Sequence, residues 1–121
     1  MSDQSRRHPT DVVRSFIQAY QADRLEDVLA LISPVLVWLP LSRPGRSRYV
    51  GHDGFRHMLA DVTAAWGERP RFELPDIEEL ADDTVIARGW VSVPEKTAIQ
   101  IVFKLRDGLI VMADVDEPLD G

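Results

Sequence analysis

The sequence predicts an α+β protein, a cone-shaped barrel in which a curved antiparallel sheet wraps against three N-terminal helices. Two observations predict this fold class. Apolar residues recur with helical spacing in the first half of the 121-residue chain, and from residue 71 onward they alternate with a period of two. The later apolar stretches are joined by short turns, which connect antiparallel neighbours. A cavity is expected between the helices and the sheet.

Three helices are expected, at about residues 10–20, 25–32 and 53–66. Thr10 has the side chain of an N-cap and is placed at the start of the first helix. The second helix should end before Pro34, because the residue that precedes a proline avoids the helical region. These boundaries leave room for one strand before the third helix.

A glycine turn locates the third helix. A strand at residues 35–39 and a loop at residues 40–47 lead to Gly51, which has no Cβ and can turn where other residues clash. His52 or Asp53 is then expected to cap the helix.

Four strands in an antiparallel meander are expected in the second half. They cover about residues 72–80, 84–93, 97–106 and 109–116. The turns between them contain Asp82-Asp83, Pro94-Glu95-Lys96 and Asp107-Gly108, which are too short for a parallel crossover. We expect a single domain over residues 1–121, with a flexible tail at about residues 1–8.

Composition excludes several classes of protein. The chain has no cysteine, and its three histidines are scattered, so no disulfide, metal site or cofactor is expected. Residues 1–60 carry 8 basic and 6 acidic side chains, whereas residues 61–121 carry 6 and 14. An acidic chain without a basic helix face is a poor nucleic-acid binder. No apolar run reaches the roughly 20 residues that span a bilayer, so we expect a cytoplasmic protein that binds no membrane.

One basic cluster stands apart from the acidic balance. Arg43, Arg46 and Arg48 lie in and beside the loop that precedes the third helix. We favour a solvated loop, and the alternative is a pocket rim that attracts an anion.

Three segments resemble the SnoaL-like branch of the nuclear transport factor 2-like superfamily. They are DVVRSFIQAYQADRLEDVLALISPVLVWLP, RYVGHDGFRHMLADV and FKLRDGLIVMADV, and they stand in the order and spacing of that branch. The resemblance implies a cone-shaped α+β barrel, frequently a homodimer packed through the outer sheet face, with a pocket for a small, mostly apolar molecule. It implies no single activity, because the superfamily includes isomerases, polyketide cyclases, epoxide hydrolases and pure binders.

The resemblance also implies positions for catalytic groups, and this sequence has lost the isomerase set. Members of the ketosteroid isomerase type use a tyrosine, a general-base aspartate and a protonated aspartate. The matching positions here hold Phe16, Leu39 and Ile101. These side chains can neither donate to an oxyanion nor accept a proton.

The epoxide hydrolase set is incomplete as well. Members resembling limonene epoxide hydrolase use an Arg-x-Asp pair and a second aspartate on the last strand. Here Arg88 is kept, Trp90 replaces its acid, and Val115 stands at the last position. Asp114 and Asp116 flank Val115, and their one-residue offset should point them out of the cavity unless the alignment slips by one.

Strand alternation predicts which side chains line the pocket. We expect Arg88, Trp90 and Ile101 to face inward, and Trp38 and Met112 to lie on the outer face, where they would serve a dimer interface. The predicted ligand-pocket residues are Phe16, Tyr20, Leu39, Tyr49, Arg88, Trp90, Ile101, Phe103 and Val115. The alternative for the apolar members of this set is that they only fill the core.

Arg88 has two possible roles. A buried guanidinium cannot lose its charge, so it either pairs with a carboxylate such as Asp76 or Glu78, or holds an oxygen of a weakly anionic ligand. His52 is expected to be a turn residue and His57 to be exposed, so neither is assigned to acid–base chemistry.

The missing acids favour a protein that binds a small apolar or weakly anionic molecule and catalyses no reaction. The alternative is a cofactor-independent polyketide cyclase, isomerase or epoxide hydrolase-type enzyme that uses Arg88 with a hydroxyl or a displaced acid. A purely structural module would instead have a filled interior. No catalytic residue is assigned from the sequence.

Overall fold

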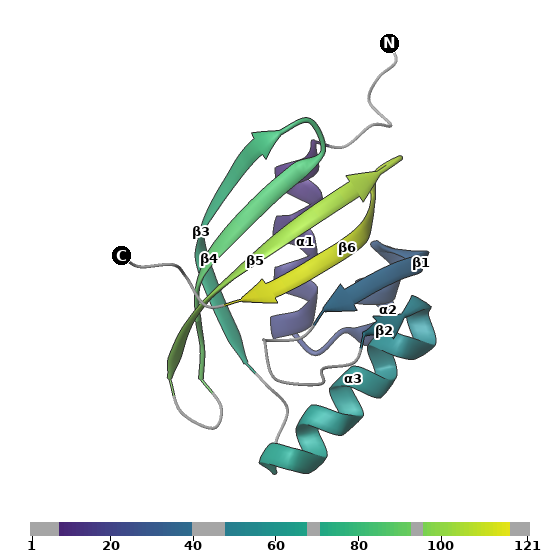
Figure 1. Cartoon of the computed structure of the whole chain (residues 1–121), viewed down its shortest axis with the longest axis vertical. Coiled ribbons are helices and arrows are strands. Elements are labelled where there is room, and N and C mark those ends of the chain that lie inside the picture. Colours follow the sequence, from purple (N-terminus) through teal and green to yellow (C-terminus); the bar gives the residue numbers. More distant parts are fainter. Residues whose placement is uncertain (1–7, 40–47, 68–70, 93–95, 117–121) are drawn as a thin grey trace.

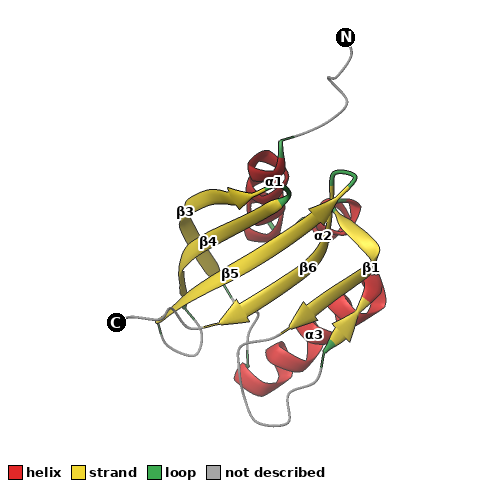
Figure 2. Cartoon of the chain, turned by 45° about the horizontal axis from the view of Figure 1, so that its top comes forward, coloured by secondary structure: helices red, strands yellow, loops and turns green. Residues whose placement is uncertain are grey.

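Helices and a curved sheet form the two layers of the protein, in a computed structural model that describes residues 8–39, 48–67, 71–92 and 96–116 (Figure 1). The helices are α1 (Pro9–Gln21), α2 (Leu25–Ala30) and α3 (Gly51–Trp66). The strands are β1 (Ile32–Leu39), β2 (Tyr49–Val50), β3 (Phe72–Ala81), β4 (Thr84–Val91), β5 (Thr97–Arg106) and β6 (Leu109–Asp116). The predicted α+β cone is confirmed, with the helices packed behind one face of the sheet (Figure 2).

The sheet has the strand order β2-β1-β6-β5-β4-β3. Strands β3 to β6 form the predicted antiparallel meander. Strand β1, in contrast, runs parallel to β6. Short turns enforce antiparallel pairing only between sequence neighbours, and the long path from β1 to β6 through α3 permits the parallel pair.

The hairpin turns follow their residue types. Asp107 and Gly108 have φ angles of 55° and 79°, and two positive φ angles in a row are the geometry that an Asp-Gly turn favours between twisted strands. The bounds of β5 and β6 agree with the sequence prediction. The tail at residues 1–7 and the loop at residues 40–47 lie outside the described residues.

Three predicted helix boundaries are wrong. Helix α1 begins at Pro9 with His8 as its N-cap, ahead of Thr10, because a proline loses nothing at the first helical position. Helix α2 ends at Ala30, and strand β1 already begins at Ile32. The third case is α3, which starts two residues earlier than expected.

Strand β1 tolerates Pro34 because it bulges there. Ile32 pairs with Ile110 and Val37 with Met112, so five steps along β1 match two along β6. The Ser33 hydroxyl accepts a hydrogen bond of 3.0 Å from the Val35 amide inside this bulge.

Helix α3 begins at Gly51, which has a φ of 77°, and its N-cap Val50 makes no side-chain cap. A Cβ at Gly51 would lie 2.9 Å from the Pro34 carbonyl oxygen, so the bulge in β1 requires a glycine opposite it. The expected cap by His52 or Asp53 is wrong. The His52 ring instead places Nε2 2.9 Å from the Ile32 carbonyl oxygen and ties α3 to β1.

The close approach of the β3 backbone to Gly89 on β4 bends the sheet. The register of β3 against β4 shifts between Glu73 and Asp76, and a Cβ at Gly89 would overlap the Glu73 carbonyl oxygen. Glycine therefore lets β3 fold over β4, and the resulting curvature encloses the interior. No helix in the described ranges is long and apolar enough to cross a membrane.

Candidate functional site

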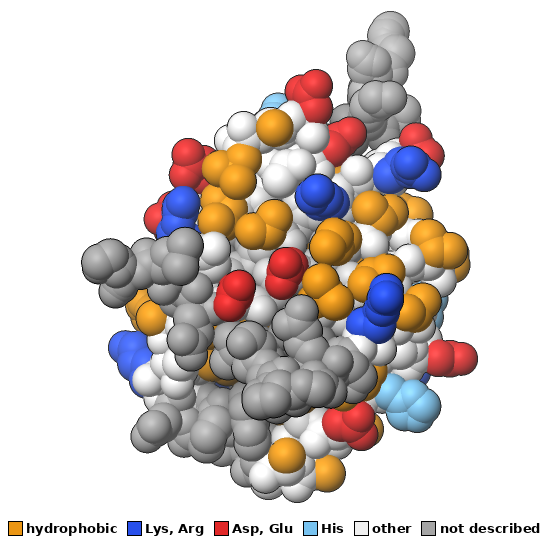
Figure 3. Space-filling view, in the orientation of Figure 1, with side chains coloured by type: hydrophobic (Ala, Val, Ile, Leu, Met, Phe, Trp, Pro, Cys, Tyr) orange, Lys and Arg blue, Asp and Glu red, His pale blue; other side chains and the backbone are white. Residues whose placement is uncertain are grey.

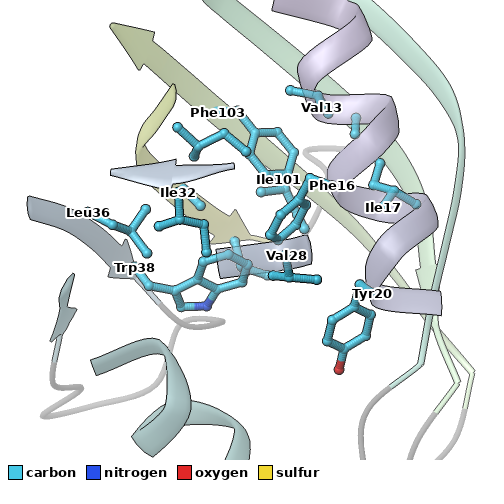
Figure 4. Close-up of a cluster of buried hydrophobic side chains, with 14 of the residues drawn as sticks. Val13, Phe16, Ile17, Tyr20, Val28, Ile32, Leu36, Trp38, Ile101 and Phe103 are labelled. Carbon is cyan, nitrogen blue, oxygen red and sulfur yellow. The ribbon is translucent and has the colours of Figure 1, made fainter. Parts of the chain in front are cut away.

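The rings of Phe16, Trp38, Phe55 and Phe103 occupy the interior between the helices and the sheet. Figure 4 shows Phe16, Trp38 and Phe103. The Phe16 ring centroid lies 6.1 Å from that of Trp38, 6.2 Å from Phe55 and 5.7 Å from Phe103. Trp38 and Phe55 meet edge to face at 5.3 Å. Each of the four is at most 3% exposed. We call these four residues the aromatic cluster; their rings lie at the distances that favour aromatic contacts.

A second aromatic pair lies beside this cluster, where α1 ends. Tyr20 and Phe72 have ring centroids 5.2 Å apart, and the Tyr20 hydroxyl points away from Phe16 (Figure 4). The Gln21 side-chain amide donates a hydrogen bond of 2.7 Å to the Phe72 carbonyl and fixes the end of α1 against β3.

The hydroxyl of Tyr49 lies at the edge of the interior. It pairs with Trp38 across the β1–β2 ladder, and its half-buried side chain packs against the core. Its hydroxyl donates a hydrogen bond of 3.0 Å to Oδ2 of Asp61, an exposed residue on α3.

Most strand positions that face the interior are apolar. Glu79 and Thr97 share this face, because they pair with Val85 and Val91, but they lie near strand ends and are exposed or half-buried. The buried inward residues on the sheet are Ile32, Leu36, Trp38, Leu74, Val85, Ala87, Val91, Ile99, Ile101, Phe103, Leu105, Ile110, Ala113 and Val115. Within the described residues, Ser33 is the one buried polar side chain, and no group of acids and histidines could hold a metal ion.

The predicted inward orientation of Arg88 is wrong. The β4–β5 register pairs Ala87 with Ile101 and Arg88 with Gln100, and cross-strand partners share a sheet face. Arg88 therefore lies on the face opposite Ile101, with a side chain that is 41% exposed. Its Nη1 lies 3.3 Å from Oε1 of Glu78 and 3.7 Å from Oδ2 of Asp76. The ion-pair role of Arg88 is confirmed.

Trp90 shares the outer face with Arg88. It pairs with Ala98 in the β4–β5 ladder, and the Lys96 ammonium lies 4.3 Å from the centroid of its ring. The expectation that Trp90 faces inward is wrong for the same reason as for Arg88.

Trp38 and Leu39 exchange their predicted faces. Trp38 pairs with Ala113 on the inner side and is 2% exposed, whereas Leu39 pairs with Asp114 on the outer side. The β1 bulge separates this part of the strand from its start, so alternation could not be read across it. Met112 lies on the outer face, as expected, opposite Lys104.

The remaining members of the predicted pocket reach the interior or its edge. Phe16, Tyr20, Ile101, Phe103 and Val115 are buried inside, and Tyr49 lies at the edge. Their contact with a ligand stays a prediction. The predicted pocket did not include Trp38, Phe55 or Phe72, which the structure places among the interior aromatics.

Other predicted features lie outside the interior. Asp114 and Asp116 pair with outer-face residues, so the aspartates of the last strand do point away from the core. His57 is exposed, as expected. Arg48 is exposed, and Arg43 and Arg46 fall outside the described residues.

Two hollows of about 510 and 480 Å³ flank the solvent-facing side of α1. They share Gln18, and their walls consist mainly of exposed side chains of α1, α2 and β3. Neither is lined by the aromatic cluster.

Fold and interior define an α+β cone protein whose helix-covered sheet face is apolar and aromatic. The chain belongs to the SnoaL-like domain family, whose sequence model matches residues 13–113. The SnoaL-like resemblance stated from the sequence is therefore confirmed. No protein in the curated set of known sequences matches the chain.

Solved structures share the fold at low sequence identity. TerC, co-crystallised with polyporic acid, matches with a TM-score of 0.76 and 18% identity over 89% of this chain and 90% of that chain. A candidate polyketide cyclase from Sinorhizobium meliloti matches with a TM-score of 0.71 and 17% identity over 87% and 93%. An NTF2-like protein of unknown function from Cytophaga hutchinsonii matches with a TM-score of 0.71 and 16% identity over 95% and 92%.

Proposed function

We propose that this protein binds a small, mostly apolar organic molecule against the aromatic rings of the cone interior and catalyses no reaction on it. The observation that carries the proposal is the aromatic cluster beneath a sheet face whose buried positions on β3 to β6 are all apolar. An apolar interior of this kind suits an apolar ligand, and its described buried side chains include no acid or histidine that could take or give a proton. The co-crystallisation of TerC with polyporic acid supports the use of this fold for binding organic molecules.

The ligand would lie between the Tyr20–Phe72 pair and the Trp38–Tyr49 pair. Trp38 belongs to the aromatic cluster and Tyr20 lies beside it, and each pair contains one tyrosine hydroxyl. An amphipathic ring of this kind combines contact area with one polar interaction.

Fluorescence titration with the neutral apolar probe N-phenyl-1-naphthylamine tests the proposal. We expect saturable binding to the full chain and a several-fold higher Kd for Trp38→Phe, which reshapes the interior while keeping an aromatic ring. The matched control Trp90→Phe changes the outer face and should leave Kd unchanged. Absence of saturable binding would contradict the proposal and favour a structural module with a filled interior.

An enzyme remains the second candidate, because solved neighbours include candidate polyketide cyclases. Arg88 is engaged by two carboxylates on the other face, so a reaction would depend on the hydroxyls of Tyr20 or Tyr49. Mass spectrometry of any bound compound after incubation separates the two functions: an altered mass or isomer supports an enzyme, and an unchanged compound supports a binder.

We also propose a homodimer through the outer sheet face. Half-buried or exposed apolar side chains gather there from three neighbouring strands and from β2, as Figure 3 shows for this side of the molecule. They include Val37, Val50, Val102 and Met112, and Ile86 on β4 is buried without belonging to the core cluster. Exposed apolar surface of this kind suits a protein partner.

Light scattering after gel filtration tests the dimer. Val102→Glu should convert a dimer of about twice the 13.7 kDa chain mass to a monomer, because an unpaired charge would enter the interface. Gln18→Glu adds the same charge on the solvent-facing side of α1, away from the sheet, and as the control should leave the dimer intact. A wild-type monomer at high concentration would contradict the dimer. The cytoplasmic location and the lack of a nucleic-acid partner stay predictions from the sequence.

A further inference from the structure

Two contacts that involve carboxylates indicate which charge a ligand of the proposed site would meet. On the outer face, Arg88 is held by Glu78 and Asp76 at 3.3 and 3.7 Å. At the edge of the interior, the Tyr49 hydroxyl donates a hydrogen bond of 3.0 Å to Oδ2 of Asp61. Arg88, the candidate to hold an anionic ligand, therefore lies on the face away from the interior. The polar group at the edge of the interior is the Tyr49 hydroxyl, and its partner is the carboxylate of Asp61.

The Tyr49–Asp61 pair is positioned by the fold. Tyr49 lies beside Trp38 on the inner side of the β1–β2 ladder. A Cβ at Gly54 would lie 2.8 Å from the Tyr49 carbonyl carbon, so this glycine lets α3 approach the tyrosine closely. The phenol then extends along α3 and reaches Asp61, two helical turns beyond Gly54.

Asp61 keeps acceptor capacity after it binds Tyr49. A carboxylate has two oxygens with about four lone-pair directions and no donor, and Tyr49 uses one of those directions. Among the described residues, Asp61 takes part in no ion pair. The nearest cation along α3 in sequence, Arg56, is engaged by Asp53 at 3.2 Å. The pair therefore presents negative charge and hydrogen-bond acceptors.

We propose that the Tyr49–Asp61 pair selects neutral aromatic molecules that carry a hydroxyl and rejects carboxylates of the same shape. This inference rests on the proposed binding function and adds the chemical class of the ligand. A ligand hydroxyl donates to the Asp61 carboxylate in a charge-assisted hydrogen bond, whereas a ligand carboxylate meets like charge and brings no donor. Such selection by repulsion is a common source of specificity.

Three probes of one shape test the proposal: naphthalene, 2-naphthol and 2-naphthoate, titrated at pH 7 into the full chain by tryptophan fluorescence. We expect 2-naphthol to bind on the order of tenfold more tightly than naphthalene, the ratio for one hydrogen bond to a charged group. We expect 2-naphthoate to bind more weakly than 2-naphthol by at least that factor.

Two variants assign the selectivity. Asp61→Asn removes the charge of an exposed residue, so the fold should persist, and the preference for 2-naphthol over 2-naphthoate should fall several-fold. Asp53→Asn is the matched control, because Asp53 is an acid of the same helix with a side chain that is 94% exposed. It should keep the wild-type preference.

The outcomes separate this inference from the proposed function. Equal binding of all three probes would overturn the inference and leave the binding function standing. Tighter binding of 2-naphthoate would also overturn it and would favour the arginine cluster at residues 43–48 as an anion-attracting rim. Failure of all three probes, naphthalene included, would overturn the binding function and the inference together.

Discussion

The two faces of the sheet differ in what they expose, although the same strands build both. On β4, Ala87 faces the interior and is fully buried, and its neighbour Arg88 faces outward into an ion-pair cluster with two acids. On β6, Val115 and Ala113 face inward while Asp114 faces outward. Among the described charged residues of the strands, Glu79 alone shares the inner face, through its pairing with Val85. It lies near the end of β3, where its Oε1 is 3.8 Å from Nδ1 of His8. The comparison shows that the interior of this sheet is apolar where it is buried, and that its polar side chains lie on the outer face and at the strand ends.

Truncation of a buried side chain on the inner face should have the largest effect on the free energy of unfolding. Phe103→Ala removes a fully buried ring that contacts Phe16 and should lower the free energy of unfolding by about 3–5 kcal/mol. Lys104→Ala, the next residue on the outer face, should change it by less than about 0.5 kcal/mol. Urea denaturation measures both, and equal losses would contradict the division between the faces.

Substitution of Gly89, which allows the sheet to curve, should have the second largest effect on the free energy of unfolding. Gly89→Ala places a methyl group against the Glu73 carbonyl and should cost about 1–3 kcal/mol, because the β3 backbone must move to admit it. Urea denaturation gives the loss, and hydrogen exchange should show faster exchange confined to β3 and β4. A neutral effect would mean that β3 does not press on Gly89.

Loss of the outer ion pairs should have the smallest effect. Arg88→Gln removes contacts with Glu78 and Asp76 from a partly exposed position and should cost about 0.2–1 kcal/mol, less at high salt. Kd for the neutral apolar probe should not change. A large rise in that Kd would return Arg88 to the ligand site.

Periodicity and turn chemistry predicted most of the fold. The Asp107-Gly108 turn located β5 and β6 at their observed bounds, because two-residue turns of this type constrain both flanking strands. The start of α3 and the end of α2 were misplaced by two residues each. Both boundaries depend on the close approach of Gly51 to the Pro34 carbonyl oxygen. This approach joins two segments that are not neighbours in the sequence, so local patterns do not reveal it.

The site was harder to predict than the fold. Phe16, Ile101 and Phe103 were placed inside because they belong to long uninterrupted patterns, whereas Arg88 and Leu39 were placed on the wrong face. A shift of one residue places a strand side chain on the opposite face of the sheet. Because Arg88 stands between two residues without polar side chains, the sequence did not show which of the two alternating sets faces inward.

The sequence by itself determined the class of fold, the SnoaL-like membership and the lack of the familiar catalytic acids at the aligned positions, since these depend on residue types and local spacing. Only the tertiary structure decided the faces of Arg88, Trp90 and Trp38, the parallel β1–β6 pair and the meeting of Tyr49 with Asp61. Register between strands and contacts between distant segments arise from the packing of the whole chain, and bulges break the alternation that would reveal them in the sequence.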